Sequence, residues 1–217
     1  MFHDELEIEP IEGLPELLPE GEVILWQGRP QWWVLAWESL SLPWVIGYFL
    51  LLTAWHFISV IDQMSFGLAV GVALPFLILG LVVIALFLIV GFLQARAALY
   101  TVTNRRVVMR IGAALTVTLN LPYNQIVNAS LRDGRWGTGT IALETMGEAR
   151  LSYLVCWPHV RPWYMSRTQP ALRAIPEPDK VARIVADAAQ SRTLETPDSS
   201  KHSDFSSRLM NFIVPAE

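Results

Sequence analysis

The residues that could catalyse a reaction or bind a metal are far apart in this sequence of 217 residues. Cys156 is the single cysteine, and the four histidines stand at His3, His56, His159 and His202. Zinc sites and nucleophilic catalysis need Cys, His or acidic groups at short spacings, and neither G-x-S-x-G nor H-E-x-x-H occurs. The sequence therefore predicts a protein without a metal centre and without enzymatic activity.

The segment Gly134–Gly139 (GRWGTG) superficially resembles a nucleotide-binding glycine loop. Such loops hold phosphate because they lead into the N-terminus of a helix, whose free N–H groups face the anion. Here the glycines lie between two stretches of β character. We therefore expect a tight turn between strands.

His56 differs from the other histidines because it lies inside a long apolar run. An imidazole within a bilayer is costly unless it pairs, faces another helix or binds a metal. A hydrogen bond to a neighbouring helix or an approach to the nearby membrane surface meets this requirement. Ligation of a metal would meet it too, so both interpretations stay open.

Two apolar segments, 43–61 and 66–93, are predicted to cross a membrane, because about 20 helical residues span an apolar core of about 30 Å. The connection 62–65 is so short that the two spans must form an antiparallel hairpin. Gly67 and Gly71 form a GxxxG pair that would let the helices approach closely.

The charges predict the orientation of the hairpin. The connection between the spans has no Lys or Arg, whereas four arginines follow the second span closely, namely Arg96, Arg105, Arg106 and Arg110. Basic residues stay on the cytoplasmic side, so both termini are expected in the cytoplasm. The N-terminus lacks the basic and apolar regions of a cleavable signal peptide.

Aromatic and acidic residues dominate the chain before the first span. Residues 1–41 carry nine acids against one base, and residues 96–217 carry fifteen bases against ten acids. This split points to charged partners, or to contact between the two parts, rather than to nucleic acid. Residues 1–20 are predicted to be an acidic arm and 21–42 a short strand, at Glu22–Trp26, with an interfacial segment. Indole rings favour the level of the lipid headgroups. The expected membrane interface is therefore formed by Arg96 and four tryptophans, namely Trp32, Trp33, Trp37 and Trp44.

In residues 97–190 the apolar residues recur with a period of two. This pattern predicts an antiparallel β-sandwich or open barrel, capped by a C-terminal helix. The helix is expected to begin at Pro178 and Asp179. Residues 191–217 are predicted to be a flexible tail. Phe205, Leu209 and Phe212 in it have the spacing of a short amphipathic helix, so a docking element is the alternative to a frayed terminus. The expected strands are Leu99–Thr103, Arg106–Ile111, Leu115–Leu121, Ile126–Leu131, Thr140–Thr145 and Ala149–Leu154.

A Trp- and Pro-rich excursion, Cys156–Tyr164, follows the predicted strands. Trp157, Trp163 and Tyr164 could form a contact surface for a partner, since exposed aromatic residues dominate many interfaces. Burial of the same rings in the domain's own core is the competing interpretation.

Several segments together resemble the bacterial pleckstrin-homology (PH) domain of membrane proteins: Tyr100–Val108 (YTVTNRRVV), Leu121-Pro122 with Ile126, and Gly137–Ile141 (GTGTI). Before the spans, Glu22–Trp26 and Gly28-Arg29-Pro30 are similar to the corresponding segment of that superfamily. Over residues 12–190 the whole arrangement resembles the PuhB family, assembly factors for the photosynthetic reaction centre of purple bacteria.

This resemblance implies a non-enzymatic protein of the bacterial inner (intracytoplasmic) membrane that promotes assembly of the reaction centre and its core antenna. Its expected partners are the reaction-centre subunits H, L or M, core-antenna polypeptides, membrane lipids and a second copy of the chain. No cofactor is expected, with contact between His56 and bacteriochlorophyll as the alternative. Arg105 and Arg106 are candidates for binding acidic partner loops or lipid headgroups. A lipid-sensing or scaffolding membrane protein is the alternative function.

Overall fold

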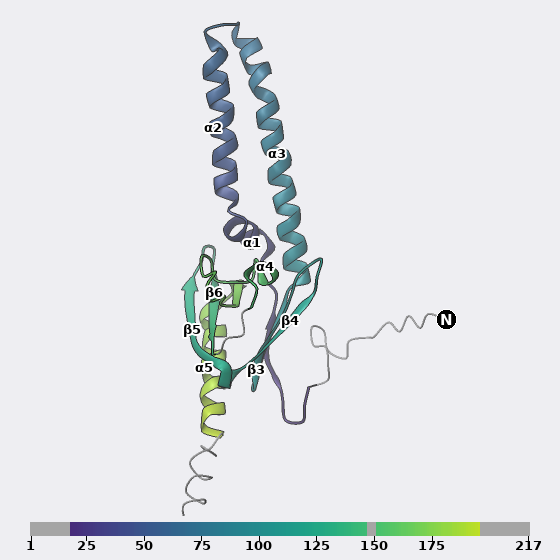
Figure 1. The fold of residues 1–217 in the computed structure, drawn as a ribbon, viewed down its shortest axis with the longest axis vertical. Coiled ribbons are helices and arrows are strands. Elements are labelled where there is room, and N and C mark those ends of the chain that lie inside the picture. Colours follow the sequence, from purple (N-terminus) through teal and green to yellow (C-terminus); the bar gives the residue numbers. More distant parts are fainter. Residues whose placement is uncertain (1–17, 147–150, 196–217) are drawn as a thin grey trace, which may run out of the picture.

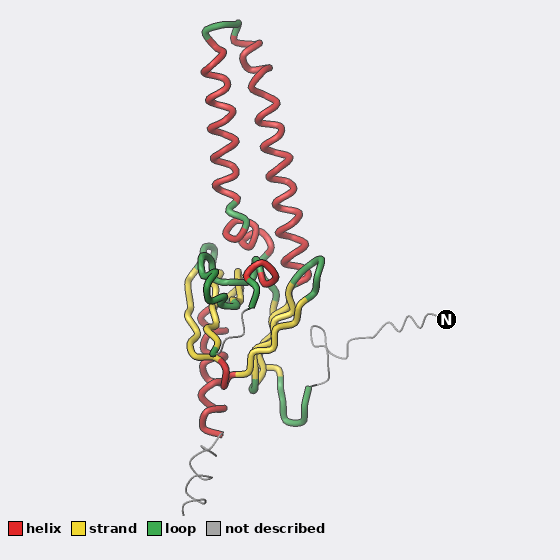
Figure 2. Tube along the Cα trace, in the orientation of Figure 1, coloured by secondary structure: helices red, strands yellow, loops and turns green. Residues whose placement is uncertain are grey.

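The computed structural model describes residues 18–146 and 151–195 and places a helical hairpin on one end of a mixed β and α domain (Figures 1 and 2). Its elements follow in this order: β1 (Ile24–Gly28), α1 (Trp32–Ser39), α2 (Leu42–Ile61), α3 (Phe66–Ala97), β2 (Leu99–Thr103), β3 (Arg106–Ile111), β4 (Val117–Pro122), the 3-10 turn η1 (Tyr123–Gln125), β5 (Ile126–Asp133), β6 (Thr138–Thr145), α4 (Tyr153–Cys156), β7 (Ala171–Pro176) and α5 (Pro178–Glu195).

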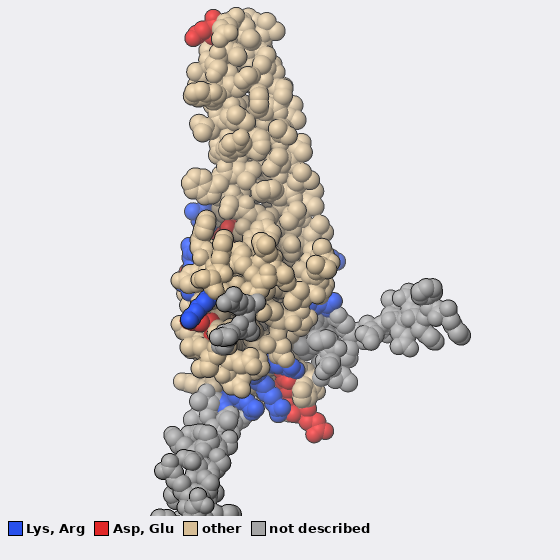
Figure 3. Space-filling view, in the orientation of Figure 1, with Lys and Arg blue, Asp and Glu red and all other residues tan. Residues whose placement is uncertain are grey.

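The helices α2 and α3 are long and apolar enough to cross a membrane, with 20 and 32 residues. The first agrees with the predicted span to within a residue, and the second continues past the predicted end at residue 93 to Ala97. Most of their surface is uncharged (Figure 3). The hairpin therefore confirms the two predicted apolar helices.

Gly67 and Gly71, the GxxxG pair, do not bring α2 and α3 together. The prediction that this pair allows the close approach was wrong for contact within the hairpin. A Cβ added at Gly67 or Gly71 would meet nothing within 4 Å. The close approach is at Gly80, where an added Cβ would lie 2.8 Å from the Cβ of Phe49. The pair lies on an exposed face of α3, whereas Ala69 and Ala73 are buried.

The β part consists of two antiparallel sheets. Strands β1 to β4 form the first sheet in that order, and β5, β6 and β7 form the second. The first strand, β1, precedes the helical hairpin in the chain, yet it pairs with β2, with Gln27 opposite Thr101. The predicted boundary at residue 97 is thus too late, because the domain begins with β1 and encloses the hairpin as an insertion.

Helix α5 caps the sheets and closes a shared core. Val181, Val185 and Ala188 on one face of the helix are buried against strand residues such as Val102 and Ile141. The helix runs to Glu195, five residues past the predicted end of the domain at residue 190. The predicted PH-like arrangement of antiparallel sheets with a C-terminal helix is confirmed, and among the described residues the two sheets do not close into a barrel.

Most strands lie where the sequence predicts them, but one prediction was wrong. In place of the end of the predicted strand Ala149–Leu154, the structure has helix α4, which begins at Tyr153. The last strand is instead β7, in which Ala171 to Ile175 are all buried. A strand that is buried on both faces lacks the alternation of apolar and polar residues by which a half-buried strand is recognised in a sequence. Phe205, Leu209 and Phe212 lie outside the described residues.

Candidate functional site

The junction between hairpin and domain has almost no linker. Only Ala98, itself buried, separates α3 from β2. On the incoming side, Gly28 of β1 lies opposite Tyr100 of β2. The guanidinium of Arg29 also donates from Nη1 to the carbonyl oxygen of Arg96, at 3.0 Å. Two paired strands and a continuous helix therefore hold the hairpin in one orientation relative to the sheet.

Helix α1 fills the angle between α3 and the domain. Val34 and Leu35 form a small buried cluster with Ala95 of α3 and Ala174 of β7. The backbone also fixes the start of α1 against β7, because the N–H of Gln31 donates to the carbonyl oxygen of Ala174 at 2.8 Å. Helix α1 is thus part of the junction and not only a lead into the first apolar helix.

Of the four tryptophans predicted for a membrane interface, three contact other aromatic rings of the protein and one is largely exposed. Trp33 and Trp37 of α1 contact Trp136 in the β5–β6 turn, with ring centroids 4.6 Å and 6.0 Å apart. Trp32 faces the other way and meets Phe92 of α3 at 6.0 Å. Trp44 is exposed on α2. The glycine-rich segment around Trp136 is a turn between β5 and β6, as predicted, and the structure adds its contact with α1.

A group of buried polar side chains connects the two sheets. The hydroxyl of Tyr100 on β2 lies 2.6 Å from Nδ1 of His159 and accepts the backbone N–H of Arg173 on β7 at 3.3 Å. The guanidinium of Arg173 donates to the carbonyl oxygen of Pro158 at 3.3 Å. These bonds tie the segment after α4 to both sheets, and sequence spacing gave no sign of them because the partners are 59 and 73 residues apart.

The electrostatics of this group follow from its burial. Burial, with a smaller contribution from the nearby charge of Arg173, lowers the pKa of His159 to about 3. Burial also lowers the pKa of Arg173, while the carboxylate of Glu38 on α1 opposes that shift. Nε2 of His159 is buried without a hydrogen-bond partner, as are Oγ of Ser39 on α1 and Oε1 of Gln94 on α3. The junction therefore combines dense packing with polar groups whose hydrogen-bonding capacity is unused.

The buried His159 makes stability dependent on pH. Its pKa is about 3 in the folded protein, against a reference value of 6.5, so between these values the unfolded chain binds a proton that the folded chain does not. We expect its contribution to be complete above pH 6.5 and to decline as the pH falls toward 3. The measurement is the urea midpoint of the full-length protein in detergent across this range. In His159→Gln, which removes the titrating ring, this part of the pH dependence should shrink; an unchanged pH profile would contradict the assignment.

In the Cys156–Tyr164 excursion, some residues are buried in the domain and others are exposed, so each of the two interpretations applies to part of it. Trp157 is half-buried against the domain core, and Cys156 is buried. Trp163, in contrast, is 88% exposed. Beside it, the guanidinium of Arg161 lies 4.1 Å from the ring centroid of Tyr164. Trp163, Tyr164 and Met165 are exposed side by side in sequence and are called the aromatic loop below.

Arg105 and Arg106 lie at the end of the first sheet that is opposite to the hairpin. Nε of Arg106 pairs with Oε1 of the buried Glu22 at 2.8 Å, and Nη2 of Arg105 donates to the carbonyl oxygen of Glu20 at 3.0 Å. Their position follows from the register, because Leu99 next to α3 and Thr103 before this turn are the two ends of β2. Both side chains hold the segment before β1, and binding of a partner or lipid by them stays a prediction.

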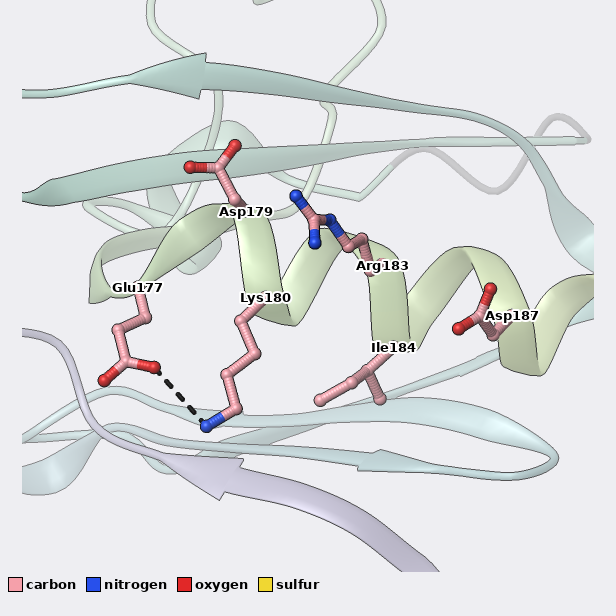
Figure 4. Close-up of a pocket in the computed structure, with 6 residues that line it drawn as sticks. All are labelled: Glu177, Asp179, Lys180, Arg183, Ile184 and Asp187. Carbon is pink, nitrogen blue, oxygen red and sulfur yellow. Dashed lines mark ion pairs between the residues drawn. The ribbon is translucent and has the colours of Figure 1, made fainter.

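Two depressions flank helix α5, and neither gathers catalytic groups. The first contains both acids and bases, and its Lys180 and Glu177 form an exposed ion pair at 3.4 Å (Figure 4). Figure 4 shows Asp179 and Arg183 directed to another side of the helix, so the charges diverge. The second is a groove of about 540 Å³ between α5 and the edge strand β5, with Val127, Leu131 and Ala186 in its wall. No sequence motif marks this groove.

His56 packs against the neighbouring helix. Its ring lies 4.7 Å from the ring of Phe76 on α3, measured between centroids. Within residues 18–146 and 151–195, no group of three or more metal-ligating side chains comes together. Ligation of a pigment by His56 stays a prediction.

The fold and the junction together define a class of protein: a hairpin of two apolar helices inserted behind the first strand of a PH-like domain. The family model for bacterial PH domains (bPH_2) matches residues 40–189. A protein of Rhodobacter capsulatus described as "Uncharacterized 23.7 kDa protein in puhA 5'region" is 45% identical over 197 residues, which cover 90% of this chain and 92% of that protein. No solved structure matches. The chain belongs to the bacterial PH-domain family.

Proposed function

We propose that this protein is a non-enzymatic assembly factor for the photosynthetic reaction centre and its core antenna, anchored in the inner membrane by α2 and α3 with both termini in the cytoplasm. Its relative from Rhodobacter capsulatus is described by its position in the puhA 5' region, which agrees with the resemblance to the PuhB family. The partners are reaction-centre subunits H, L or M. The lack of Lys and Arg between the helices supports the orientation.

The observation that carries this proposal is the aromatic loop on a rigidly attached domain. Trp163 is 88% exposed, with a φ of 69°. A non-glycine residue held at positive φ is strained, and such residues cluster at binding and switch sites. Exposed Trp and Tyr are also the residue types that most often anchor protein interfaces. The loop is therefore the surface where we expect a reaction-centre polypeptide to bind.

The alternative function, lipid sensing through Arg105 and Arg106, has less support. These arginines lie at the end of the domain away from the hairpin and bond to Glu20 and Glu22. A headgroup site would need them at the hairpin end, because α2 and α3 fix where the bilayer lies.

The experiment is a mild-detergent pull-down of the full-length chain from cells that are making photosystems, read by mass spectrometry and pigment spectra. We expect recovery of reaction-centre polypeptides, and Trp163→Ala should weaken their binding about tenfold, or about 1.4 kcal/mol. Val23→Ala is the matched control, since Val23 is exposed at the far end of the domain. Recovery of the wild-type chain without photosynthetic polypeptides would contradict the function, and unchanged binding by Trp163→Ala would remove the loop from it.

A further inference from the structure

The end of the domain that faces the hairpin carries exposed apolar side chains on three separate segments. Leu99 pairs with Arg110, and Ile111 pairs with Val117, so the β3–β4 turn lies beside the foot of α3. Leu115 in that turn is 81% exposed. In Figure 1, where the longest axis is vertical, α4 lies at the height of the hairpin end of the domain, and its Leu154 is 84% exposed. The β5–β6 turn is the third segment, because its Trp136 contacts Trp33 of α1.

This end of the domain cannot swing away from the hairpin. Helix α3 leads into β2 through one buried residue, and β1 pairs with β2 on the other side of the insertion. Val34 and Leu35 of α1 pack between α3 and β7. The exposed leucines are therefore held at a fixed height along the hairpin axis.

That height corresponds to the headgroup layer. The 32 residues of α3 extend about 48 Å at 1.5 Å per residue. A bilayer is about 40–45 Å thick with its headgroups. When the polar turn between the helices lies in one headgroup layer, the end of α3 reaches the other. Figure 3 also shows basic side chains where the uncharged hairpin meets the domain.

We propose that the hairpin end of the domain is itself a membrane-binding surface, with Leu115, Leu154 and Val155 inserted in the interfacial layer. This inference rests on the proposed membrane insertion of α2 and α3. The occupant is the bilayer because the apolar side chains continue the apolar surface of the hairpin itself. Arg132 and Arg135 are exposed beside Trp136 and meet anionic headgroups. The contact fixes the domain against the membrane and leaves the aromatic loop at a defined distance from it.

The test measures lipid exposure with spin labels in the full-length protein, reconstituted in liposomes of phosphatidylethanolamine and phosphatidylglycerol. Single cysteines are introduced by Leu115→Cys and Leu154→Cys in a Cys156→Ala background, and each label's collisions with oxygen and with a water-soluble nickel complex are compared. Leu51→Cys on α2 is the control for lipid and Val23→Cys at the far end of the domain is the control for water; both native side chains are exposed.

We expect the oxygen-to-nickel ratio at positions 115 and 154 to be closer to that at position 51 than to that at position 23. A water-like ratio at either position, with a lipid-like ratio at 51, overturns the inference and leaves the membrane anchor intact. A water-like ratio at all four positions overturns the anchor as well. Because Leu115 and Leu154 are more than four-fifths exposed, the labels replace side chains that make few contacts.

Discussion

Glu22→Ala is expected to lower the free energy of unfolding by about 3 kcal/mol, because it leaves a partly buried guanidinium without its counter-charge. The Glu22 side chain is 1% exposed and that of Arg106 is 25% exposed. Oε1 of Glu22 accepts hydrogen bonds from Nε of Arg106 and from Oγ1 of Thr103, both at 2.8 Å. The change would also loosen the start of β1, whose pairing with β2 holds the hairpin.

The measurement is a urea titration of the full-length protein in detergent. Glu177→Ala is the matched control, since Glu177 forms an exposed ion pair with Lys180 and its loss should cost less than about 1 kcal/mol. A double variant, Glu22→Met with Arg106→Met, should recover most of the stability because it removes both buried charges. Equal losses from Glu22→Ala and Glu177→Ala would show that the buried pair does not stabilise the sheet.

Local patterns predicted the elements but not their partners. The strands β2 and β3 were predicted at their observed bounds because each is a short β-branched run beside the Asn104 turn. The pairing of β1 with β2 was missed because Gln27 and Thr101, which lie opposite each other, are separated by the whole hairpin. For the same reason, no local pattern could show that Arg106 is committed to Glu22.

The aromatic residues show the same limit. Trp residues before an apolar helix are typical of a membrane interface, and that pattern is present. The pattern does not show that Trp33 and Trp37 face Trp136, because that contact depends on how the β5–β6 turn meets α1. The sequence likewise left the Cys156–Tyr164 excursion open, and the structure buries part of Trp157 while exposing Trp163. Composition thus shows where aromatic residues are concentrated, and packing decides which rings remain exposed.

The second large effect is expected at Gly91, where α1 meets α3. A Cβ added there would lie 2.6 Å from the Cβ of Ala36 and 3.2 Å from its Cα. Both atoms belong to a helix that the domain holds from the other side, so Gly91→Leu should force α1 away from α3. We expect a loss of about 3 kcal/mol, the upper end for overpacking, even though leucine favours helix more than glycine does.

Gly67→Leu and Gly71→Leu are the matched controls for Gly91→Leu, because an added Cβ at either position meets nothing within 4 Å. Both should leave the thermal midpoint of the full-length protein in detergent unchanged or slightly raised, while Gly91→Leu lowers it and increases proteolysis around Trp136. The reverse order would mean that the helices pack through the GxxxG face after all. Because α1 carries Trp33, Trp37 and Glu38, its displacement would remove one of the contacts that hold the hairpin against the domain. Under the proposed function, Gly91→Leu should then also weaken the binding of reaction-centre polypeptides.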